Sequence, residues 1–503
     1  MYDTVEEVLA AAKEAKWAGA DLVEVRLDAL KPFNPADDVP RLLAELALPC
    51  VMTLRPTWEG GFCELPEPRR LAILKYAASL GAAYVDVEFK VAAYFFKEYD
   101  DLASTRTRFI LSSHNFETTP PLGALEEHVR RCRRLIADCF PVKAPRPVIK
   151  LVVTARDASD ALCVLGLTRR TTAEGQPMIG LAMGEAGLPS RLLAGTAGGE
   201  LTFATLPRGR ASAPGQPPLA EVLGRYRLRD QRPGATRVWG VVGDPVAHSK
   251  GPVIHNAALQ SLGVDGVYVA FHVKDFPSFL ATARRSGVPL AGLSAAALEA
   301  ADHADPLAAG IGAANTLVWD GRGRSTAFNT DGRAAIAAIE QGVRESRLGG
   351  SAEAEQDRSP LLHRHVVVVG AGGAGRAVAV AAAQAGARVT ICNRTESKAT
   401  ELAAAVRRAV PDSSVEAAPL HSVQSGEVKG DVLANTTQIG MHPDVESSPV
   451  PADVLGAYAV VFDAVYVPLH TRLLRDAEAV EQFWLFTGQE ADVEVMRGAL
   501  EGA

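Results

Sequence analysis

Cysteine, aromatic residues and long apolar runs are scarce in this sequence, and positive charge is not in excess. The six cysteines among 503 residues form no C-x-x-C pair, which disfavours a disulfide scaffold or a structural zinc site, so we expect no metal. Lys and Arg number 52 against 59 Asp and Glu, which leaves a net charge of −7 and no basic field for nucleic acid. No apolar run reaches the roughly 18 residues that span a bilayer, so we expect no membrane partner.

The composition that remains is that of a folded chain. Hydrophobic residues make up 48% and charged residues 22%, and the length predicts two or three cores. The first residues, MYDTVEEVLAAAKEAK, are acidic and helical in pattern, unlike a signal or transit peptide. We expect a soluble multidomain chain in a reducing compartment.

Short apolar, β-rich runs alternate with helical stretches from residue 20 to residue 206. The runs begin roughly 25 to 35 residues apart, which is the period of βα units in a (β/α)8 barrel of the TIM type. They cover residues 20–28, 50–56, 82–89, 108–116, 148–155, 177–184 and 201–206. Because only seven runs are present and a helix precedes the first, we expect the first barrel strand to be missing and two sheet edges to be unpaired.

A second α/β pattern follows a stretch rich in proline, arginine and glycine at 207–236, which we interpret in part as a linker. We therefore divide the chain into three domains. They are a barrel at 1–225, a substrate-binding domain at 237–345 and a Rossmann domain at 346–503 whose C-terminal segment returns to the substrate-binding domain.

A strand, a glycine-rich turn and an Ala-rich helix follow one another in VVVVGAGGAGRA. The turn has the G-x-G-x-x-G pattern, with Gly370, Gly372, Gly373 and Gly375. This context predicts a site where backbone amides approach a dinucleotide pyrophosphate, and a tight turn in an ordinary αβ unit is the alternative. The next strand ends at Asn393, Arg394 and Thr395. Arginine there favours the 2′-phosphate of NADP, although Glu396 beside it fits the opposite preference.

Two residues of the first half suggest chemistry on a ketone. Lys150 lies in the apolar run VIKLVV, where desolvation favours the neutral amine that forms an imine; a lysine that reaches solvent from a strand end fits the same pattern. His114 ends another strand, at the rim where barrel enzymes carry their active sites. A structural hydrogen-bonding role is the alternative for this histidine.

The motifs EVRLD, TLRPTWEGG, SSHNF, the strand lysine, MGEAGLPSR and SAPGQ occur in this order over about residues 5–225. Together they resemble type I 3-dehydroquinate dehydratase. The resemblance implies an imine on Lys150, with His114 as general base and acid and Glu59 orienting it. It also implies substrate contacts from Arg191, Ser212 and Gln216 to the carboxylate and ring, from Glu24, Arg26 and Arg55 to hydroxyls, and apolar walls from Met183 and Phe203.

The second half resembles shikimate dehydrogenase over about residues 238–490. The motifs are GVVGDPVAHSKGPVIHN, GIGAANTLVWDG, AFNTDG, GAGGAGRA, NRT, ANTTQIGMHP and FDAVYVP. The whole chain is therefore similar to the fused dehydratase/dehydrogenases of plants, which implies small shikimate-pathway substrates, NADP and a chloroplast location, with the cytoplasm as the alternative. The implied dehydrogenase residues are Asp331 in catalysis, Ser249, Asn315, Thr330 and Tyr466 at the substrate, and Gly440 and Met441 near the nicotinamide.

Three departures from the dehydrogenase pattern weaken the second activity. The family's SxS motif is Ser249-Lys250-Gly251 here, which removes one hydroxyl and makes quinate an alternative substrate. No VTxPxK segment follows GLS at 292–294, so the lysine that partners Asp331 has no counterpart. The stretch that supplies a substrate-binding glutamine is absent after residue 480, and Gln482 does not replace it. We expect a poor dehydrogenase, and a non-catalytic NADP-binding half is the remaining alternative.

Overall fold

The computed structural model describes residues 1–99, 105–208, 210–296, 298–346, 348 and 359–478. The chain consists of two compact units, Met1–Leu293 and Ser294–Ala503. Within these described ranges, no helix combines the length and the apolar character needed to cross a membrane. The missing glutamine stretch, predicted after residue 480, lies outside the described residues.

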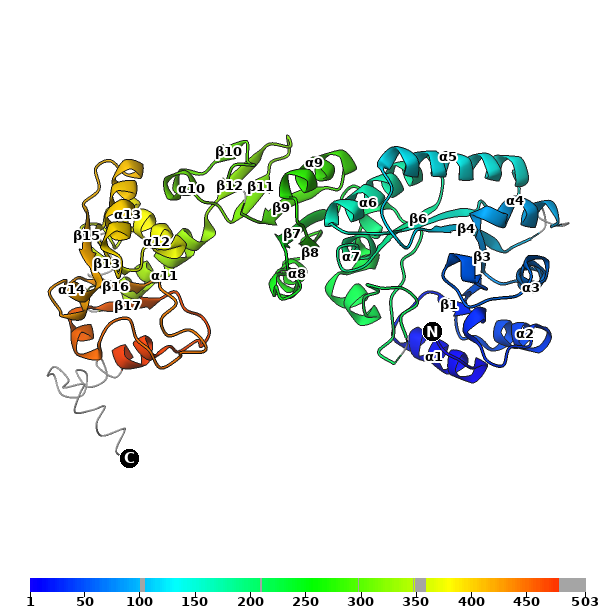
Figure 1. Cartoon of the computed structure of the whole chain (residues 1–503), viewed down its shortest axis with the longest axis horizontal. Helices are drawn as coiled ribbons and strands as arrows, with labels where there is room; N and C mark the ends of the chain where they lie inside the picture. Colours follow the sequence, from blue (N-terminus) through cyan, green and yellow to red (C-terminus); the bar gives the residue numbers. More distant parts are fainter. Residues whose placement is uncertain (100–104, 209, 297, 347, 349–358, 479–503) are drawn as a thin grey trace, which may run out of the picture. The chain divides into compact units, whose positions relative to one another are not determined.

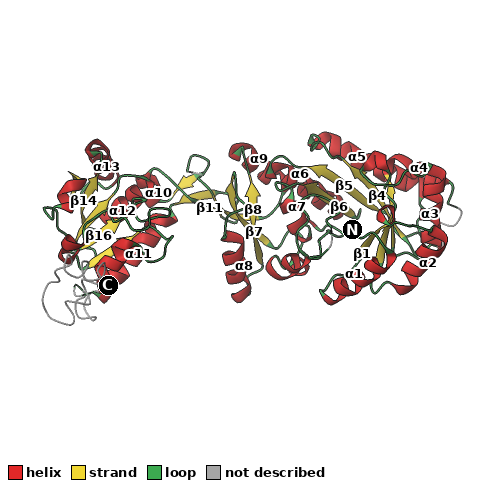
Figure 2. Cartoon of the chain, turned by 60° about the horizontal axis from the view of Figure 1, so that its bottom comes forward, coloured by secondary structure: helices red, strands yellow, loops and turns green. Residues whose placement is uncertain are grey.

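A six-stranded parallel sheet opens the first unit, and its strand order follows the chain from β1 to β6 (Figure 1). The strands are β1 (Val23–Arg26), β2 (Cys50–Thr53), β3 (Tyr84–Glu88), β4 (Arg108–His114), β5 (Val148–Thr154) and β6 (Met178–Met183). Figure 2 shows helices lying along the outer side of these strands. The helices are α1 (Val5–Trp17), α2 (Pro35–Glu45), α3 (Glu67–Ser79), α4 (Phe89–Lys97), α5 (Leu122–Cys139), α6 (Ala158–Ala173) and α7 (Leu188–Leu192).

Alternation along the strands divides the side chains between two layers. In β5, Ile149, Leu151 and Val153 join the large core that lies under the helices, whereas Val148 and Val152 belong to a smaller cluster on the opposite, inner face. Lys150 shares the inner face because it stands two residues from each of them. Parallel strands bring their carboxyl ends to one edge, so inner-face residues near those ends can form a single site.

The strand predicted at 201–206 does not form. Thr205 alone makes an isolated bridge to Pro218, and the amide of Leu219 donates to the Thr205 carbonyl at 2.9 Å. β1 and β6 are consequently the two edges of the sheet, as the missing first strand led us to expect. A cavity of about 510 Å³ lies between α1, β1 and residues 201–206. The amide of Glu200 donates to the carbonyl of Met178 at the start of β6 at 2.9 Å, but no β ladder continues from this bond along residues 201–206.

A second six-stranded sheet has the order β10-β12-β11-β9-β7-β8. Its strands are β7 (Arg237–Gly243), β8 (Gly266–His272), β9 (Leu290–Ser294), β10 (His303–Ala304), β11 (Thr316–Trp319) and β12 (Ser325–Phe328). The accompanying helices are α8 (Gly251–Ser261), α9 (Phe276–Ser286), α10 (Pro306–Ile311) and α11 (Thr330–Glu345). In the first unit, α9 packs on α6 so closely that a Cβ on Gly166 would lie 2.8 Å from the Cα of Ser286.

The second unit contains a five-stranded parallel sheet of order β15-β14-β13-β16-β17. Its strands are β13 (His365–Val369), β14 (Arg388–Asn393), β15 (Val415–Pro419), β16 (Val432–Asn435) and β17 (Val460–Asp463), with helices α12 (Gly373–Gln384), α13 (Glu396–Ala409) and α14 (Leu420–Gln424). The central strand β13 is a fully apolar run after His365, as expected for a strand covered on both faces. The chain order turns back at β13, where doubly wound sheets bind their ligands. The predicted α/β fold, a barrel-type sheet followed by a Rossmann unit, is confirmed.

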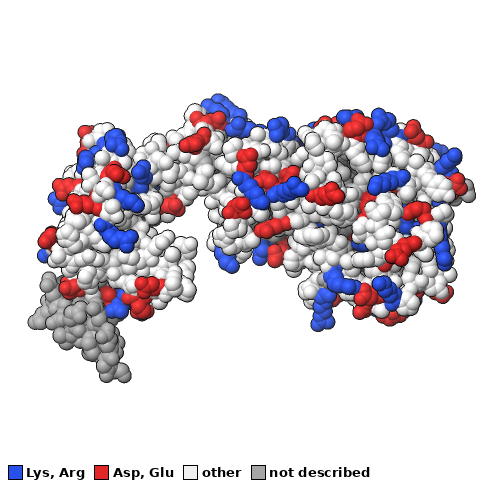
Figure 3. Space-filling model, in the orientation of Figure 1, with Lys and Arg blue, Asp and Glu red and all other residues white. Residues whose placement is uncertain are grey.

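Acidic and basic side chains are interspersed on the face of the molecule drawn in Figure 3. This distribution agrees with the small net charge of −7.

Candidate active sites

Lys150 occupies the centre of β5, on the inner face of the barrel-type sheet. Its side chain is buried, and Nζ donates to Oδ2 of Asp86 at 3.0 Å. Oε1 of Glu24 lies 3.8 Å from Nζ, and the Phe203 ring centroid lies 4.7 Å away. The amine is therefore held within the protein by a carboxylate and an aromatic face, which rules out the alternative of a lysine that reaches solvent.

His114 stands at the end of β4 and is oriented by Glu59. Oε1 of Glu59 lies 3.0 Å from both the backbone nitrogen and Nδ1 of the histidine. Burial raises the pKa of Glu59 to about 7, against the lowering effect of the Arg55 charge. Burial, together with the charges of Arg55 and Lys150, lowers the pKa of His114 well below its usual value. A neutral imidazole whose Nδ1–H donates to Glu59 leaves Nε2 free to accept a proton.

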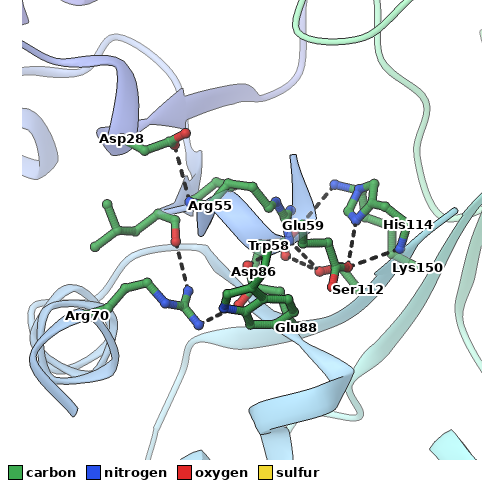
Figure 4. Close-up of polar contacts among 12 residues, drawn as sticks. Asp28, Arg55, Trp58, Glu59, Arg70, Asp86, Glu88, Ser112, His114 and Lys150 are labelled. Atoms are coloured by element: carbon green, nitrogen blue, oxygen red, sulfur yellow. Dashed lines mark hydrogen bonds and ion pairs between the residues drawn. The ribbon is translucent and has the colours of Figure 1, made fainter. Parts of the chain in front are cut away.

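Buried charged side chains form a connected network next to Lys150 (Figure 4). Arg55 pairs with Oδ1 of Asp86 at 2.9 Å and with Oε1 of Glu88 at 2.8 Å. Glu88 continues the network, because its Oε2 lies 2.8 Å from Nη2 of Arg70. Asp86, Glu88 and Arg70 are fully buried, so the network stabilises the site only while every partner is present.

Glu24 and Arg26 project from β1 near the same cavity. Oε1 of Glu24 accepts a hydrogen bond from Oγ1 of Thr53 at 3.2 Å. Arg26 forms a two-pronged pair with Asp28, with distances of 2.9 and 2.7 Å. Arg26 takes Asp28 rather than Glu24 as its partner among the described residues.

Arg191, on α7, is a buried guanidinium without a compensating carboxylate. Its side chain is 1% exposed, and neither Nε nor Nη2 has a hydrogen-bond partner among the described residues. Burial lowers the pKa of Arg191 to about 10. Nearby, Ser212 and Gln216 bind each other, through Gln216 Nε2 to Ser212 Oγ at 2.9 Å and Ser212 N to Gln216 Oε1 at 3.0 Å. An unpaired guanidinium at a cavity is suited to a carboxylate ligand.

All of the residues predicted for the dehydratase line one cavity of about 60 Å³, namely Glu24, Arg26, Arg55, Glu59, His114, Lys150, Met183, Arg191, Phe203, Ser212 and Gln216. Five of these residues also line the cavity of about 510 Å³ between α1, β1 and residues 201–206. The site therefore adjoins a much larger space on the side of β1. The sequence motifs come together, and the individual roles stay predictions.

In the second sheet, Ser249 precedes α8 and accepts a hydrogen bond on Oγ from the amide of Gly251 at 3.2 Å. A Cβ on Gly251 would lie 3.0 Å from Cε1 of Tyr268 and 3.2 Å from Oγ of Ser249. Any larger residue at 251 would have to displace these neighbours, so the glycine also fits the local packing. The glycine at this position thus has a packing reason.

Asn315 and Thr330 form one polar cluster in the second unit. Oδ1 of Asn315 accepts hydrogen bonds from both the amide and Oγ1 of Thr330, each at 3.0 Å. Asp331 follows in the exposed first turn of α11, and Tyr466 is 77% exposed after β17. Hydrogen bonds therefore join Asn315 to Thr330. Among the described residues, no hydrogen bond joins Asp331 or Tyr466 to either of them.

The lysine expected beside Asp331 has no substitute nearby in the chain. β9 ends at Ser294, and the chain contains no lysine between Lys274 and Lys398. The cationic neighbour on the same helix is Arg333, and it pairs with Asp305 at 2.6 Å. Among the described residues, no lysine forms an ion pair with Asp331.

The glycines of the turn after β13 have two different structural roles. Gly370 has φ of +112°, and a Cβ on Gly375 would lie 2.3 Å from the Gly370 carbonyl, so both allow the close approach of strand and helix. A Cβ on Gly372 or Gly373 would meet open space. These two glycines stand at the N-terminus of α12, where free amides can face a pyrophosphate.

A cavity of about 640 Å³ adjoins this turn. Gly370, Asn393, Arg394 and Gly440 line it, and Arg394 is exposed. Asn393 Nδ2 donates to the carbonyl of Thr395 at 2.9 Å, which shapes the loop after β14. Met441 is 36% exposed next to Gly440. This arrangement fits a dinucleotide whose adenosine end reaches Arg394.

Comparisons with known proteins agree with the family resemblance of each half of the chain. The family model for Type I 3-dehydroquinase matches residues 1–233, that for the shikimate dehydrogenase substrate-binding domain matches 241–317, and that for shikimate/quinate 5-dehydrogenase matches 352–439. The chloroplastic bifunctional 3-dehydroquinate dehydratase/shikimate dehydrogenase of Arabidopsis thaliana is 40% identical over 98% of this chain and 82% of its own length. The chain belongs to this bifunctional family. An NADP(+)-dependent shikimate dehydrogenase of Methanosarcina barkeri is 37% identical over 52% of this chain and 96% of its own length.

Sequence reasoning missed part of this bifunctional family member's first site. Asp86, Glu88, Ser112 and Arg70 were not among the predicted residues, although they surround Arg55 and Lys150. A signal was present: YVDVE places two carboxylates two residues apart in an otherwise apolar strand, and therefore on one face. Arg70 carries no comparable signal, because an arginine in a helix is most often a surface residue.

Proposed function

We propose that the first half dehydrates 3-dehydroquinate to 3-dehydroshikimate through an imine on Lys150, and that the second half is an NADP-linked shikimate dehydrogenase with weakened catalysis. The observation that carries the proposal is the placement of Lys150 in a cavity that also contains the His114–Glu59 pair. Family membership supports both activities in one chain.

The dehydration combines imine chemistry on Lys150 with two proton transfers through His114. The Lys150 amine adds to the substrate ketone, and water leaves to give an iminium, which draws electrons from the neighbouring C–H bond. Nε2 of His114 takes that proton, and the electron pair forms an enamine. The imidazolium then returns the proton to the departing hydroxyl, which leaves as water, and hydrolysis of the new imine frees the product and Lys150.

Substrate recognition follows from the polar and apolar side chains that line the cavity. Arg191 binds the carboxylate, because its buried Nε and Nη2 lack partners among the described residues. Ser212 and Gln216 lie over the ring, while Glu24, Arg26 and Arg55 face its hydroxyls. Met183 and Phe203 form the apolar walls. Glu59 holds His114 in the tautomer that leaves Nε2 free.

The dehydrogenase half takes NADP, with the pyrophosphate at Gly372 and Gly373 and the 2′-phosphate at Arg394. Asn393 and Thr395 shape that phosphate site, and Gly440 and Met441 lie near the nicotinamide. Ser249 binds the substrate carboxylate, and Asn315, Thr330, Asp331 and Tyr466 bind or act on the ring. Quinate is a second candidate substrate, since Gly251 leaves out the second serine hydroxyl of the family motif.

The organisation and location that go with this function are also proposals. The dehydratase occupies 1–225, the substrate-binding domain 237–345 and the cofactor domain 346–503. A chloroplast location is favoured, because the Arabidopsis relative is described as chloroplastic. The partners are small molecules of the shikimate pathway.

Borohydride trapping tests the dehydratase proposal. Reduction of the full chain in the presence of dehydroquinate should attach the ligand covalently to Lys150, and Lys150→Ala should lose both the adduct and dehydration. His114→Ala, as the companion variant, should still form the adduct while proton transfer slows by roughly 10² or more. An adduct of undiminished yield in Lys150→Ala would show that the nucleophile lies elsewhere.

A further inference from the structure

Asp86 makes the closest polar contact to the reacting nitrogen of Lys150. Its Oδ2 accepts from Nζ at 3.0 Å, while Oδ1 accepts from Oγ of Ser112 at 2.5 Å and from Nη2 of Arg55 at 2.9 Å. Asp86 is fully buried on the inner face of β3, facing Lys150 across β4. The three groups that contact Asp86 are all hydrogen-bond donors. The carboxylate is therefore placed to stabilise a positive charge on Nζ.

The carboxylate stays ionised in this position. Burial alone would raise the pKa of Asp86, but the charges of Arg55 and Lys150 hold it well below its usual range. Arg55 remains beside Asp86 whatever happens to the lysine, because its other nitrogen pairs with Glu88 at 2.8 Å. Arg70 anchors Glu88 in turn, again at 2.8 Å. The anion therefore keeps its place while the chemistry changes Nζ.

We infer that Asp86 is the counter-ion of the iminium formed on Lys150. This inference rests on the proposed function. When the amine has added to the ketone and water has left, the nitrogen carries one hydrogen and a positive charge, and Oδ2 of Asp86 accepts that N–H. Asp86 takes no proton itself. It keeps the proton on the imine, so the nitrogen remains an electron sink during removal of the neighbouring C–H proton by His114.

Glu24 is the competing counter-ion, and the geometry places it second. Its Oε1 lies 3.8 Å from Nζ, beyond hydrogen-bond distance, and already accepts from Thr53. The effect of Asp86 appears after imine formation, in the pH range over which the imine keeps its proton.

The decisive measurement is the alkaline limb of the kcat profile for dehydration. The charged and titratable groups that act on Asp86 from the surrounding strands and loops are Arg55, Glu59, Glu88, His114 and Lys150, and Glu24 lies on the other side of Nζ at 3.8 Å. Removal of one opposite charge at this distance moves a pKa by about 1–3 units. Asp86→Asn should therefore move the alkaline limb down by about 1–3 pH units and reduce kcat above it by roughly 10–10³-fold, while borohydride still traps the ligand.

Two variants provide matched controls. Asp86→Glu keeps the anion and should restore the limb to within about one pH unit of the wild-type chain. Glu24→Gln removes the more distant carboxylate and should move the limb by less than Asp86→Asn does, whatever it does to KM. A limb that moves with Glu24→Gln and not with Asp86→Asn would overturn the assignment.

The wild-type chain offers a test that needs no variant to fold. Cyanoborohydride reduces protonated imines far faster than neutral ones, so the rate of ligand trapping against pH reports the imine proton directly. Trapping should persist at least about one pH unit above the limit for the imine of butylamine with the same ketone in water. Coincident limits would refute the counter-ion role. Lys150→Ala separates the two proposals, since trapping that survives it contradicts the proposed function itself.

Discussion

Arg191 should make the ligand-free chain less stable than an apolar residue at this position would. Its buried charge has no partner until a ligand binds. The guanidinium is 1% exposed and lacks partners on Nε and Nη2 among the described residues. Burial lowers its pKa from 12.5 to about 10. A difference of roughly 2.5 units corresponds to about 3 kcal/mol of unfavourable burial of the charge.

Arg191→Met removes that charge and keeps much of the side-chain volume. We expect it to raise the free energy of unfolding of the first unit by about 1–3 kcal/mol, since apolar replacements of uncompensated buried charges are often stabilising. The melting temperature of that unit should rise by about 2–10 °C. Dehydration should suffer, because the loss of two charge-assisted hydrogen bonds of about 1.5–3 kcal/mol each lowers kcat/KM by roughly 10²–10⁴-fold.

Scanning calorimetry of the full chain, with and without dehydroshikimate, measures both effects. The ligand should stabilise the wild-type chain and fail to stabilise Arg191→Met. Arg191→Lys retains a charge without the planar fork and should fall between the two in kcat/KM. A methionine variant that melts earlier than wild type and keeps its kcat/KM would show that Arg191 is a structural residue.

Three further predictions concern protonation, cofactor choice and the second reaction. Because the pKa of Glu59 is raised to about 7, its negative charge is present above that pH and lost below it. The kcat/KM for dehydration should therefore fall as pH drops through about 7, and Glu59→Gln should give a low rate without this limb; an unchanged limb would assign it to another group. Arg394→Ala should weaken NADP by about 1.5–3 kcal/mol in calorimetric titration and leave NAD nearly unchanged, and equal losses would exclude a 2′-phosphate contact. NADPH formation from shikimate or quinate should be roughly 10²–10⁴-fold slower than in a chain with the VTxPxK segment restored. Equal turnover by both chains would show that another group supplies the proton.

Much of the fold could be predicted from the sequence alone. Six of seven predicted barrel strands form, because apolar runs about eight residues long with a βα period have few other ways to bury themselves. The glycine-rich turn could also be predicted. Its pattern requires glycine because the close approach of Gly375 to the Gly370 carbonyl leaves no room for a side chain. The motif residues of the dehydratase, including Lys150 and His114, also gather at one cavity as the resemblance implied.

The failed strand at 201–206 shows where local pattern is insufficient. Its composition favours β structure, but it forms no ladder with the edge strand β6, and a cavity of about 510 Å³ lies between it and β1. Strand formation at an edge is decided by what lies alongside, which no window of the sequence contains.

Tertiary structure alone decided how the charges are paired. Arg55, Asp86, Glu88 and Arg70 come from three segments of the chain, and each is stable in the interior only because the others neutralise it. Sequence position identified Lys150 as a candidate nucleophile, since one lysine stands in an apolar strand. Which carboxylate stands at 3.0 Å and which at 3.8 Å depends on the packing of β1, β3 and β5, and this difference assigns the partner of the reacting nitrogen.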